Sequence, residues 1–249
     1  MQSIYDNPVF FERYLKLREN PKSVNELVEK PTMFSLLPDL TGKKVLDLGC
    51  GVGDHLQIYL ELGAKTVVGL DLSSAMLEQA QHNFAKNGWK PTAYQFYNLP
   101  MQQLDQIDGT FDVITSSFAF HYIEDFADLL TKIKQKLAPN GTLIFSQEHP
   151  ITTCFRGGDR WEKDENNQQV AYRLNYYRDE GERDRNWFKQ PFKTYHRTMA
   201  TIFNQLIQAG FKIEQIEEPM LANHPEWHNE FKDLQHRPIL LFVKAIVSL

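Results

Sequence analysis

Three glycines at alternate positions lie beside an acidic residue, and this stretch is the part of the sequence best suited to hold a ligand. Gly49, Gly51 and Gly53 follow the apolar run at 45–48, which predicts a strand, a tight turn and a helix. A turn without side chains lets backbone N–H groups and a helix N-terminus approach a ligand closely. Asp47 lies inside the strand end, where its carboxylate would repel a pyrophosphate and attract an ammonium or sulfonium group. The pattern therefore favours a cationic ligand over a polyphosphorylated one.

A second acidic residue predicts that this ligand carries a ribose. Asp71 ends the next apolar run, VVGLD, and an acid at this place can accept both hydroxyls of a ribose. Nucleotide-dependent oxidoreductases use an acid here too, but they carry a third glycine where this chain has Asp54. An oxidoreductase is thus one alternative interpretation, and a glycine turn with a purely structural role is another.

The elements around the turn alternate between strands and helices. We expect strands at 44–48, 66–70, 92–96, 111–116 and 141–147, and helices at 54–62, 74–87 and 125–137. Such alternation predicts crossover units and a parallel sheet. A helix at 198–209 and two strands, at 211–217 and 238–247, follow with no long helix between the strands. These two strands predict an antiparallel edge on the parallel sheet.

Two segments lie outside this alternation. Residues 1–40 read as helical pieces broken by prolines, and residues 150–197 are rich in charged and aromatic residues. The aromatic content of the second segment is too high for a disordered linker, which predicts a partly ordered cap. Its aromatic side chains form either a small satellite core or a cage for a substrate.

The strand, glycine turn and helix, followed by an acid at the second strand end, resemble the class I S-adenosylmethionine-dependent methyltransferases over residues 40–148. This resemblance implies an α/β, Rossmann-like fold with a seven-stranded, mostly parallel sheet and an antiparallel edge strand. It implies one domain with a helical lid (1–40), a cofactor-binding core (41–149), an inserted cap (150–197) and a C-terminal completion of the sheet (198–249). It also implies S-adenosylmethionine as the cofactor. A non-catalytic module that binds this cofactor and regulates a partner is a further alternative.

The same resemblance implies which residues contact the cofactor. Asp47 and the backbone of the turn would hold its methionine portion, Asp71 its ribose, and Leu72 would lie beside its adenine. Tyr14 and Arg18, four residues apart on one helix face, either cover the cofactor and meet its carboxylate or face solvent. The expected cofactor contacts are Asp47, Gly49, Gly51, Gly53, Asp71, Leu72, Met76, Met101, Gln102, Ser116, Tyr14 and Arg18.

The run SSFAFHYIEDF after the fourth strand resembles uncharacterised bacterial small-molecule methyltransferases, and it lacks the Asn/Asp-Pro-Pro-aromatic tetrad of enzymes that methylate bases. A hydroxyl or acidic carbon acceptor needs a base, and a histidine has a suitable pKa. His121 is the first candidate and His149, at the end of the fifth strand, is the second. Each has a structural alternative, as a helix cap or a partner of backbone. The expected acceptor contacts are Phe118, Tyr122, Tyr195, His196 and Arg197, of which Tyr195 and Arg197 are equally suited to packing and ion pairing.

Composition limits the remaining function classes. The formal net charge of −5 argues against a nucleic-acid partner, because phosphate contacts need clustered Lys and Arg. Two cysteines, Cys50 and Cys154, provide neither a disulfide framework nor a zinc site, which fits a reducing cytoplasm. No apolar run is long enough for a membrane span, and no acidic cluster has the spacing of a metal site. We therefore expect a cytoplasmic, metal-free enzyme with a small-molecule substrate.

Overall fold

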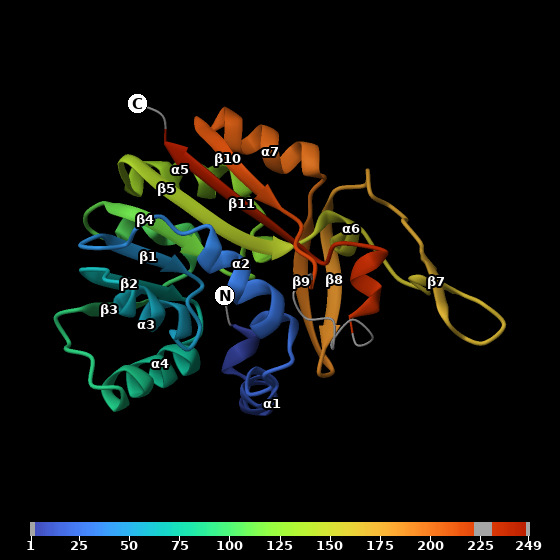
Figure 1. The fold of residues 1–249 in the computed structure, drawn as a ribbon, viewed down its shortest axis with the longest axis horizontal. Coiled ribbons are helices and arrows are strands. Elements are labelled where there is room, and N and C mark those ends of the chain that lie inside the picture. Colours follow the sequence, from blue (N-terminus) through green and yellow to red (C-terminus); the bar gives the residue numbers. More distant parts are fainter. Residues whose placement is uncertain (1–2, 222–230, 248–249) are drawn as a thin grey trace.

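A seven-stranded sheet forms the centre of the computed structural model, which describes residues 3–221 and 231–247 (Figure 1). The strand order is β10-β11-β5-β4-β1-β2-β3. The strands are β1 (Lys44–Leu48), β2 (Thr66–Asp71), β3 (Tyr94–Asn98), β4 (Phe111–Ser116), β5 (Leu137–Glu148), β10 (Phe211–Glu217) and β11 (Leu240–Val247). Strands β1 to β5 pair in parallel, and β11 runs antiparallel to both β5 and β10. The expected fold class, a mostly parallel sheet with an antiparallel edge pair, is confirmed.

Helices connect the parallel strands as the periodicity predicts. These are α3 (Asp54–Glu61), α4 (Ser74–Lys86) and α5 (Phe126–Lys136), and α7 (Met199–Gln208) precedes β10. Ser73 caps α4, since its side chain accepts a hydrogen bond from the N–H of Met76 at 3.2 Å. Strand β3 begins two residues later than expected, because residues 90–93 form a turn closed by a hydrogen bond from the N–H of Ala93 to the carbonyl of Lys90.

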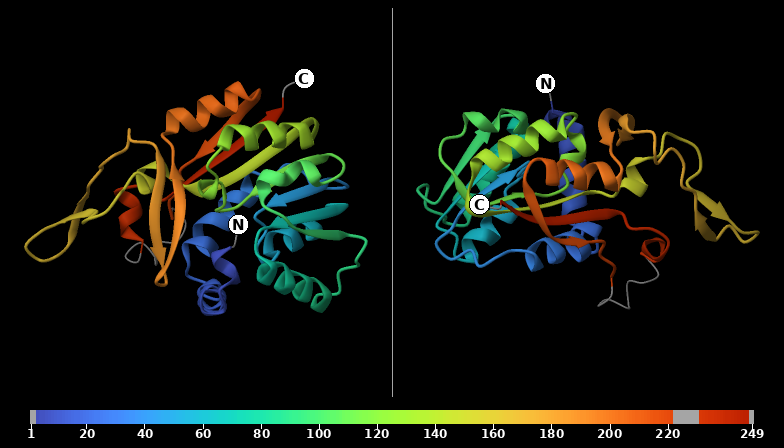
Figure 2. Two further views of the ribbon diagram at one scale, coloured as in Figure 1. Left: turned by 180° about the vertical axis from the view of Figure 1, so that it is seen from behind. Right: turned by 90° about the horizontal axis from the view of Figure 1, so that it is seen from above.

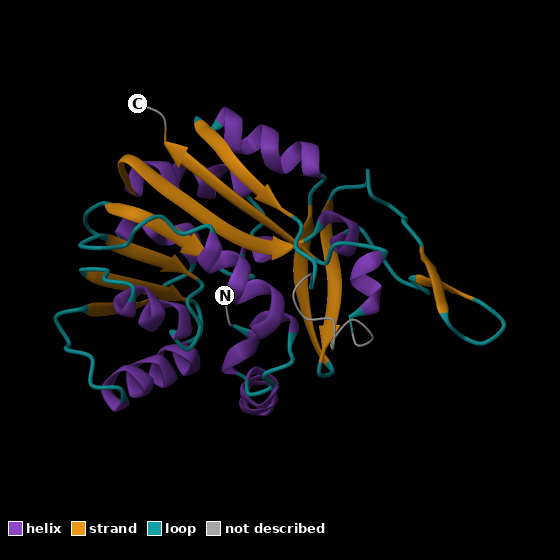
Figure 3. Cartoon of the chain, in the orientation of Figure 1, coloured by secondary structure: helices purple, strands orange, loops and turns teal. Residues whose placement is uncertain are grey.

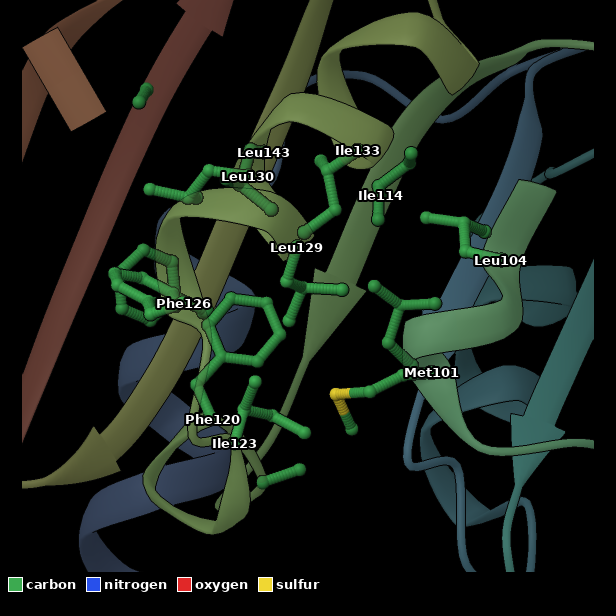
Figure 4. Packing of buried hydrophobic residues seen from close by; sticks show 14 of the residues in the cluster. Met101, Leu104, Ile114, Phe120, Ile123, Phe126, Leu129, Leu130, Ile133 and Leu143 are labelled. Carbon is green, nitrogen blue, oxygen red and sulfur yellow. The ribbon is translucent and has the colours of Figure 1, made fainter. Parts of the chain in front are cut away.

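Alternating residues along each strand bury opposite faces of the sheet. Leu46, Ile114 and Leu143 pack into one core with α5 and α7, whereas Val45 and Val113 pack into a second core with α3 and α4. A parallel sheet covered on both faces requires this continuous apolar character. Figure 4 shows the first core, where Met101 lies among the labelled leucine and isoleucine side chains. The cores hold the carboxyl ends of the strands in one row.

The N-terminal segment consists of short helices near that row. They are η1 (Ile4–Asp6), α1 (Pro8–Arg18), the π-helix η2 (Asn25–Glu29) and α2 (Lys30–Ser35). Asn7 caps α1 and Pro8 is its first residue, which is the favoured arrangement at a helix start. In Figure 1 the arrowheads of β1 and β4 point toward these helices. We refer to residues 3–40 as the N-terminal lid.

The segment 150–197 is built mainly from two hairpins (Figure 3). Helix α6 (Pro150–Thr153) leads into β6 (Trp161–Lys163) and β7 (Gln169–Tyr172), and then into β8 (Gly181–Trp187) and β9 (Gln190–His196). The β6–β7 hairpin projects away from the sheet in both views of Figure 2. The β8–β9 hairpin instead packs on the lid, where the Trp187 ring lies 5.3 Å from the Phe10 ring. The aromatic side chains are thus divided between the two hairpins. The shorter helices η3 (Met101–Gln106), η4 (Phe120–Tyr122) and η6 (Lys232–Gln235) complete the described chain.

Candidate functional site

A cavity of about 710 Å³ lies at the carboxyl ends of β1, β4 and β5, between the lid and the β8–β9 hairpin. Asp47 and the glycine turn form its floor on the sheet, Tyr14 and Arg18 face it from α1, and Trp187 faces it from the hairpin. Ligand sites of open α/β sheets lie outside the carboxyl ends of the strands. The cavity therefore lies where the sequence predicts the site.

The glycines of the turn have different physical roles. A Cβ at Gly49 would come within 2.8 Å of the Ala119 Cβ, and one at Gly53 within 2.9 Å of the Phe84 ring, so both positions require glycine for packing. A Cβ at Gly51, where φ is +54°, would lie 4.0 Å from the Met76 sulfur, which is no closer than ordinary van der Waals contact. Gly51 therefore leaves free space beside the turn, as a ligand that approaches the backbone requires.

Asp47 contributes a buried carboxylate to the cavity floor. Its side chain is 2 % exposed, and its Oδ1 accepts a hydrogen bond from the Thr115 hydroxyl at 2.8 Å. Burial raises the pKa of Asp47 to about 6, and the nearby charge of Asp71 adds to this increase. None of the ion pairs found among the described residues gives Asp47 a cationic partner. A positively charged ligand in the cavity would supply that partner.

Asp71 braces the glycine turn rather than lining the cavity. Its Oδ2 accepts the N–H of Gly51 at 2.9 Å, and its Oδ1 accepts the N–H of Ser73 at 2.8 Å. Asp6 of the lid lies next to it and accepts a hydrogen bond from the Ser73 hydroxyl at 2.7 Å. The start of the lid therefore covers the region where an acid at the second strand end would meet a ribose.

The other expected cofactor contacts, among them those expected beside the adenine, also lie outside the cavity lining. Met101 is buried in the first core, and Ser116 is buried and donates a hydrogen bond to the carbonyl of Leu48 at 2.7 Å. Met76 is buried against the turn, and the backbone carbonyl of Gln102 accepts a hydrogen bond from Lys132. Leu72 and Gly53 also do not line the cavity.

Tyr14 and Arg18 face the cavity, as expected if they cover the cofactor, and not solvent. Arg18 Nη2 lies 3.5 Å from Asp54 Oδ2, a partly buried contact that leaves the guanidinium near the glycine turn. The Tyr14 ring packs edge-on against the rings of Tyr5 and Trp187. The lid and the cap thus meet above the cavity through aromatic contacts.

The opposite end of the cavity holds His121, Glu148 and Arg185. Nδ1 of His121 accepts the N–H of Glu148 at 3.4 Å, and burial lowers the pKa of the ring, so neutral His121 carries its proton on Nε2. In that form the ring donates a hydrogen bond from Nε2. Burial alone would raise the pKa of Glu148, but the charge and hydrogen bond of Arg185, whose Nη2 lies 3.0 Å from Glu148 Oε2, lower it. Glu148 is therefore a carboxylate.

Aromatic rings surround this charged end. Phe118 and Tyr122, both expected from the sequence, line the cavity together with Trp187 and Phe192. Trp187 is one of the cap aromatics that the sequence left open between a satellite core and a substrate cage, whereas sequence reasoning missed Arg185, although Arg183, Arg185 and Trp187 alternate as one face of a strand does. This two-residue alternation was the sequence signal that could have placed Arg185 on the same strand face as Trp187.

Four expected residues lie away from the cavity. His149 caps α6 and binds Glu218, and His196 makes hydrogen bonds with Thr153 Oγ1 at 2.7 Å and the carbonyl of Tyr177 at 2.8 Å. Arg197 donates hydrogen bonds to the carbonyls of Ile123 and Glu124. The fourth, Tyr195, donates to the Glu124 carboxylate at 3.4 Å. These side chains join the cap to the sheet.

Replacing His149 with alanine is expected to reduce stability and leave ligand binding intact. His149 Nδ1 accepts the N–H of Ile151 at 3.1 Å, and loss of such a cap costs about 0.5–2 kcal/mol. Denaturant unfolding measures this loss, and calorimetry with S-adenosylhomocysteine measures binding. A tenfold weaker binding with unchanged unfolding would contradict this assignment.

Among residues 3–221 and 231–247, no group of three or more His, Cys, Asp or Glu side chains is arranged to hold a metal ion. In the same residues, no helix has the length and apolar character to cross a membrane.

Comparison with known proteins gives consistent results. A family model described as a methyltransferase domain matches residues 46–145. An uncharacterized protein of Haemophilus influenzae is 65 % identical over 98 % of this chain and 96 % of its own length. An S-adenosylmethionine-dependent methyltransferase from Mesorhizobium loti is 33 % identical, with a TM-score of 0.78 over 90 % of this chain and 98 % of that one. A putative methyltransferase of the same kind from Listeria monocytogenes is 32 % identical, with a TM-score of 0.77 over 89 % and 98 % of the two chains.

Proposed function

The chain belongs to the S-adenosylmethionine-dependent methyltransferases, and we propose that it transfers the methyl group of this cofactor to a small organic acceptor held in the covered cavity. One observation carries the proposal. The cavity of about 710 Å³ joins the carboxylate of Asp47 and the glycine turn to an aromatic end at Tyr122 and Trp187. This volume lies within the range of small-molecule sites.

The residues present at the cavity floor fit the charges of the cofactor. The buried carboxylate of Asp47 lacks a cation, and the space at Gly51 admits a ligand to the backbone. Asp47 would hold the ammonium group of the methionine portion, and Arg18 would hold its carboxylate. When bound, S-adenosylmethionine supplies a methyl group that its sulfonium charge activates for displacement.

The chain's own contribution at the other end is to position the acceptor and exclude water. Alignment of reacting groups supplies about 7–11 kcal/mol in favourable cases. The rings of Tyr122, Trp187 and Phe192 would enclose an apolar acceptor, and the Glu148–Arg185 pair would orient its polar groups. His121 is proposed as a hydrogen-bond donor to the acceptor, because its Nδ1 already accepts a backbone N–H.

The lid residues around the cavity and the net charge of the chain both bear on which class of methyl acceptor the site takes. A nucleic acid would need a groove with clustered basic residues, whereas this cavity is lined by the aromatic rings of Tyr5 and Tyr14 of the lid and the chain carries a net charge of −5. We therefore propose a small molecule rather than a nucleic acid as the substrate.

Mass spectrometry of the small molecules released when the purified protein is denatured tests the proposal. S-adenosylmethionine or S-adenosylhomocysteine is expected in the extract, and calorimetry is expected to show binding of both and none of NAD. An acceptor panel with labelled methyl donor then measures transfer. Retention of NAD, or tight cofactor binding with no transfer to any acceptor, would contradict the proposed activity.

A further inference from the structure

The N-terminal lid carries a completely buried glutamate that the cavity lining does not include. Glu29 is the last residue of η2 and has no exposed surface. Its Oε1 accepts hydrogen bonds from the hydroxyl of Ser117 at 2.5 Å and from the hydroxyl of Ser146 at 2.8 Å. One carboxylate oxygen thus connects the lid to the residue that follows β4 and to β5.

The second oxygen of this carboxylate has no hydrogen bond among the described residues. The Nε2 atom of His55 lies 3.5 Å from this second oxygen, Oε2, and burial lowers the pKa of His55 to about 3. His55 is therefore neutral and does not balance the charge of Glu29. Burial also raises the pKa of Glu29 to about 7, so the group is a carboxylate at pH 8.

Ser117 links this buried carboxylate to the cavity. It lines the cavity together with Asp47 and the glycine turn. A serine hydroxyl has one proton and two lone pairs. Since the proton of Ser117 is directed to Glu29, its oxygen offers only lone pairs to a ligand. Ser117 therefore recognises a hydrogen-bond donor, N–H or O–H, and not an acceptor.

The position of Glu29 indicates which N–H or O–H group of a ligand would donate to Ser117. His55, whose Nε2 lies 3.5 Å from Glu29 Oε2, is the second residue of α3, which directly follows the glycine turn at the cofactor end of the cavity. His121 lies instead beside Glu148 and Arg185, at the acceptor end. Glu29 and Ser117 therefore belong to the end where the methionine portion of the cofactor would lie, and its ammonium group is the N–H donor available there.

We propose that Glu29 is a positioning residue that orients the Ser117 oxygen as a hydrogen-bond acceptor for the ammonium group of the cofactor, and so couples recognition of this group to the position of the lid. The inference rests on the proposed function, because it places S-adenosylmethionine in this cavity. The carboxylate of Asp47 supplies the charge for the ammonium group, and Ser117 supplies a directed acceptor.

Calorimetry at pH 8 with two probes tests this assignment. S-adenosylhomocysteine carries the amino acid portion, and 5′-methylthioadenosine lacks it. Ser117→Ala is expected to weaken binding of S-adenosylhomocysteine about 10- to 100-fold, as for a hydrogen bond to a charged group, and to leave binding of methylthioadenosine unchanged. The matched control is Ser146→Ala, which removes the other hydroxyl that donates to Glu29 but lies outside the cavity lining.

Hydrogen exchange measures the coupling to the lid. In the wild-type protein, S-adenosylhomocysteine is expected to protect the amides of residues 8–35, and Glu29→Met, which removes the oxygen that accepts both serine hydroxyls, is expected to lose most of this protection. Should that variant fail to fold, the two serine variants still decide the assignment. Equal effects of Ser117→Ala and Ser146→Ala, or equal loss for both probes, would overturn it. Failure of the wild-type protein to bind S-adenosylhomocysteine would instead overturn the proposed function.

Discussion

Replacing Asp71 with alanine is expected to weaken binding of S-adenosylhomocysteine at least about 100-fold, because two charge-assisted hydrogen bonds to backbone are lost together. Asp71 accepts the N–H groups of Gly51 and Ser73, and so fixes both the glycine turn and the start of α4. Without this carboxylate the turn has no partner for the N–H of Gly51 in the conformation observed. Calorimetry with the folded variant measures the effect.

Asp112 offers a matched control for this variant. Its Oδ2 also accepts a backbone N–H, that of Lys44 at 2.8 Å, but at the amino end of the same sheet. Asp112→Ala is expected to leave binding unchanged. A comparable loss of affinity in both variants would mean that Asp71 acts through general stability and not through the turn.

The core of the fold was predictable because its signals are local. The run at 45–48, the glycines after it and Asp71 each mark a strand end within a few residues, and the parallel crossover places those ends in one row. The antiparallel pair β10–β11 followed from the absence of a helix between the strands. Periodicity and turn chemistry suffice where each element packs on its neighbours in sequence.

The structural alternative for His149 was visible in the sequence, because the following Pro150 starts a helix and His149 is its N-cap. The positions of Glu29 and Arg185 were not predictable by the same reasoning. Glu29 lies in a polar helical segment that reads as solvent-facing, and tertiary contacts with Ser117 and Ser146 bury it. Arg185 reaches the cavity because the β8–β9 hairpin packs on the lid. Contacts between distant segments decide these two positions.

Asp47 is expected to make cofactor affinity and stability respond to pH in opposite directions. Burial raises the pKa of Asp47 from its ordinary 3.8 to about 6, and only the ionised form attracts the ammonium group. Affinity for S-adenosylhomocysteine should therefore fall as the pH is lowered through about 6. The stability of the ligand-free protein changes with pH in the opposite direction. Between about pH 4 and 6 the folded chain binds a proton that the unfolded chain has lost, so the contribution of Asp47 to the free energy of unfolding decreases as the pH rises.

Asp47→Asn separates these two effects because it keeps the shape of the side chain and an oxygen for the Thr115 hydroxyl. At pH 8 the variant is expected to be more stable than the parent by about 1–3 kcal/mol, since a buried unpaired charge is removed. It is expected to bind S-adenosylhomocysteine at least about tenfold more weakly, as the loss of one charged hydrogen bond predicts. Denaturant unfolding and calorimetry at pH 5 and pH 8 measure both quantities. A variant that is less stable at pH 8, or one that binds the cofactor as tightly as the parent, would show that the carboxylate of Asp47 is retained for the fold and not for the ligand.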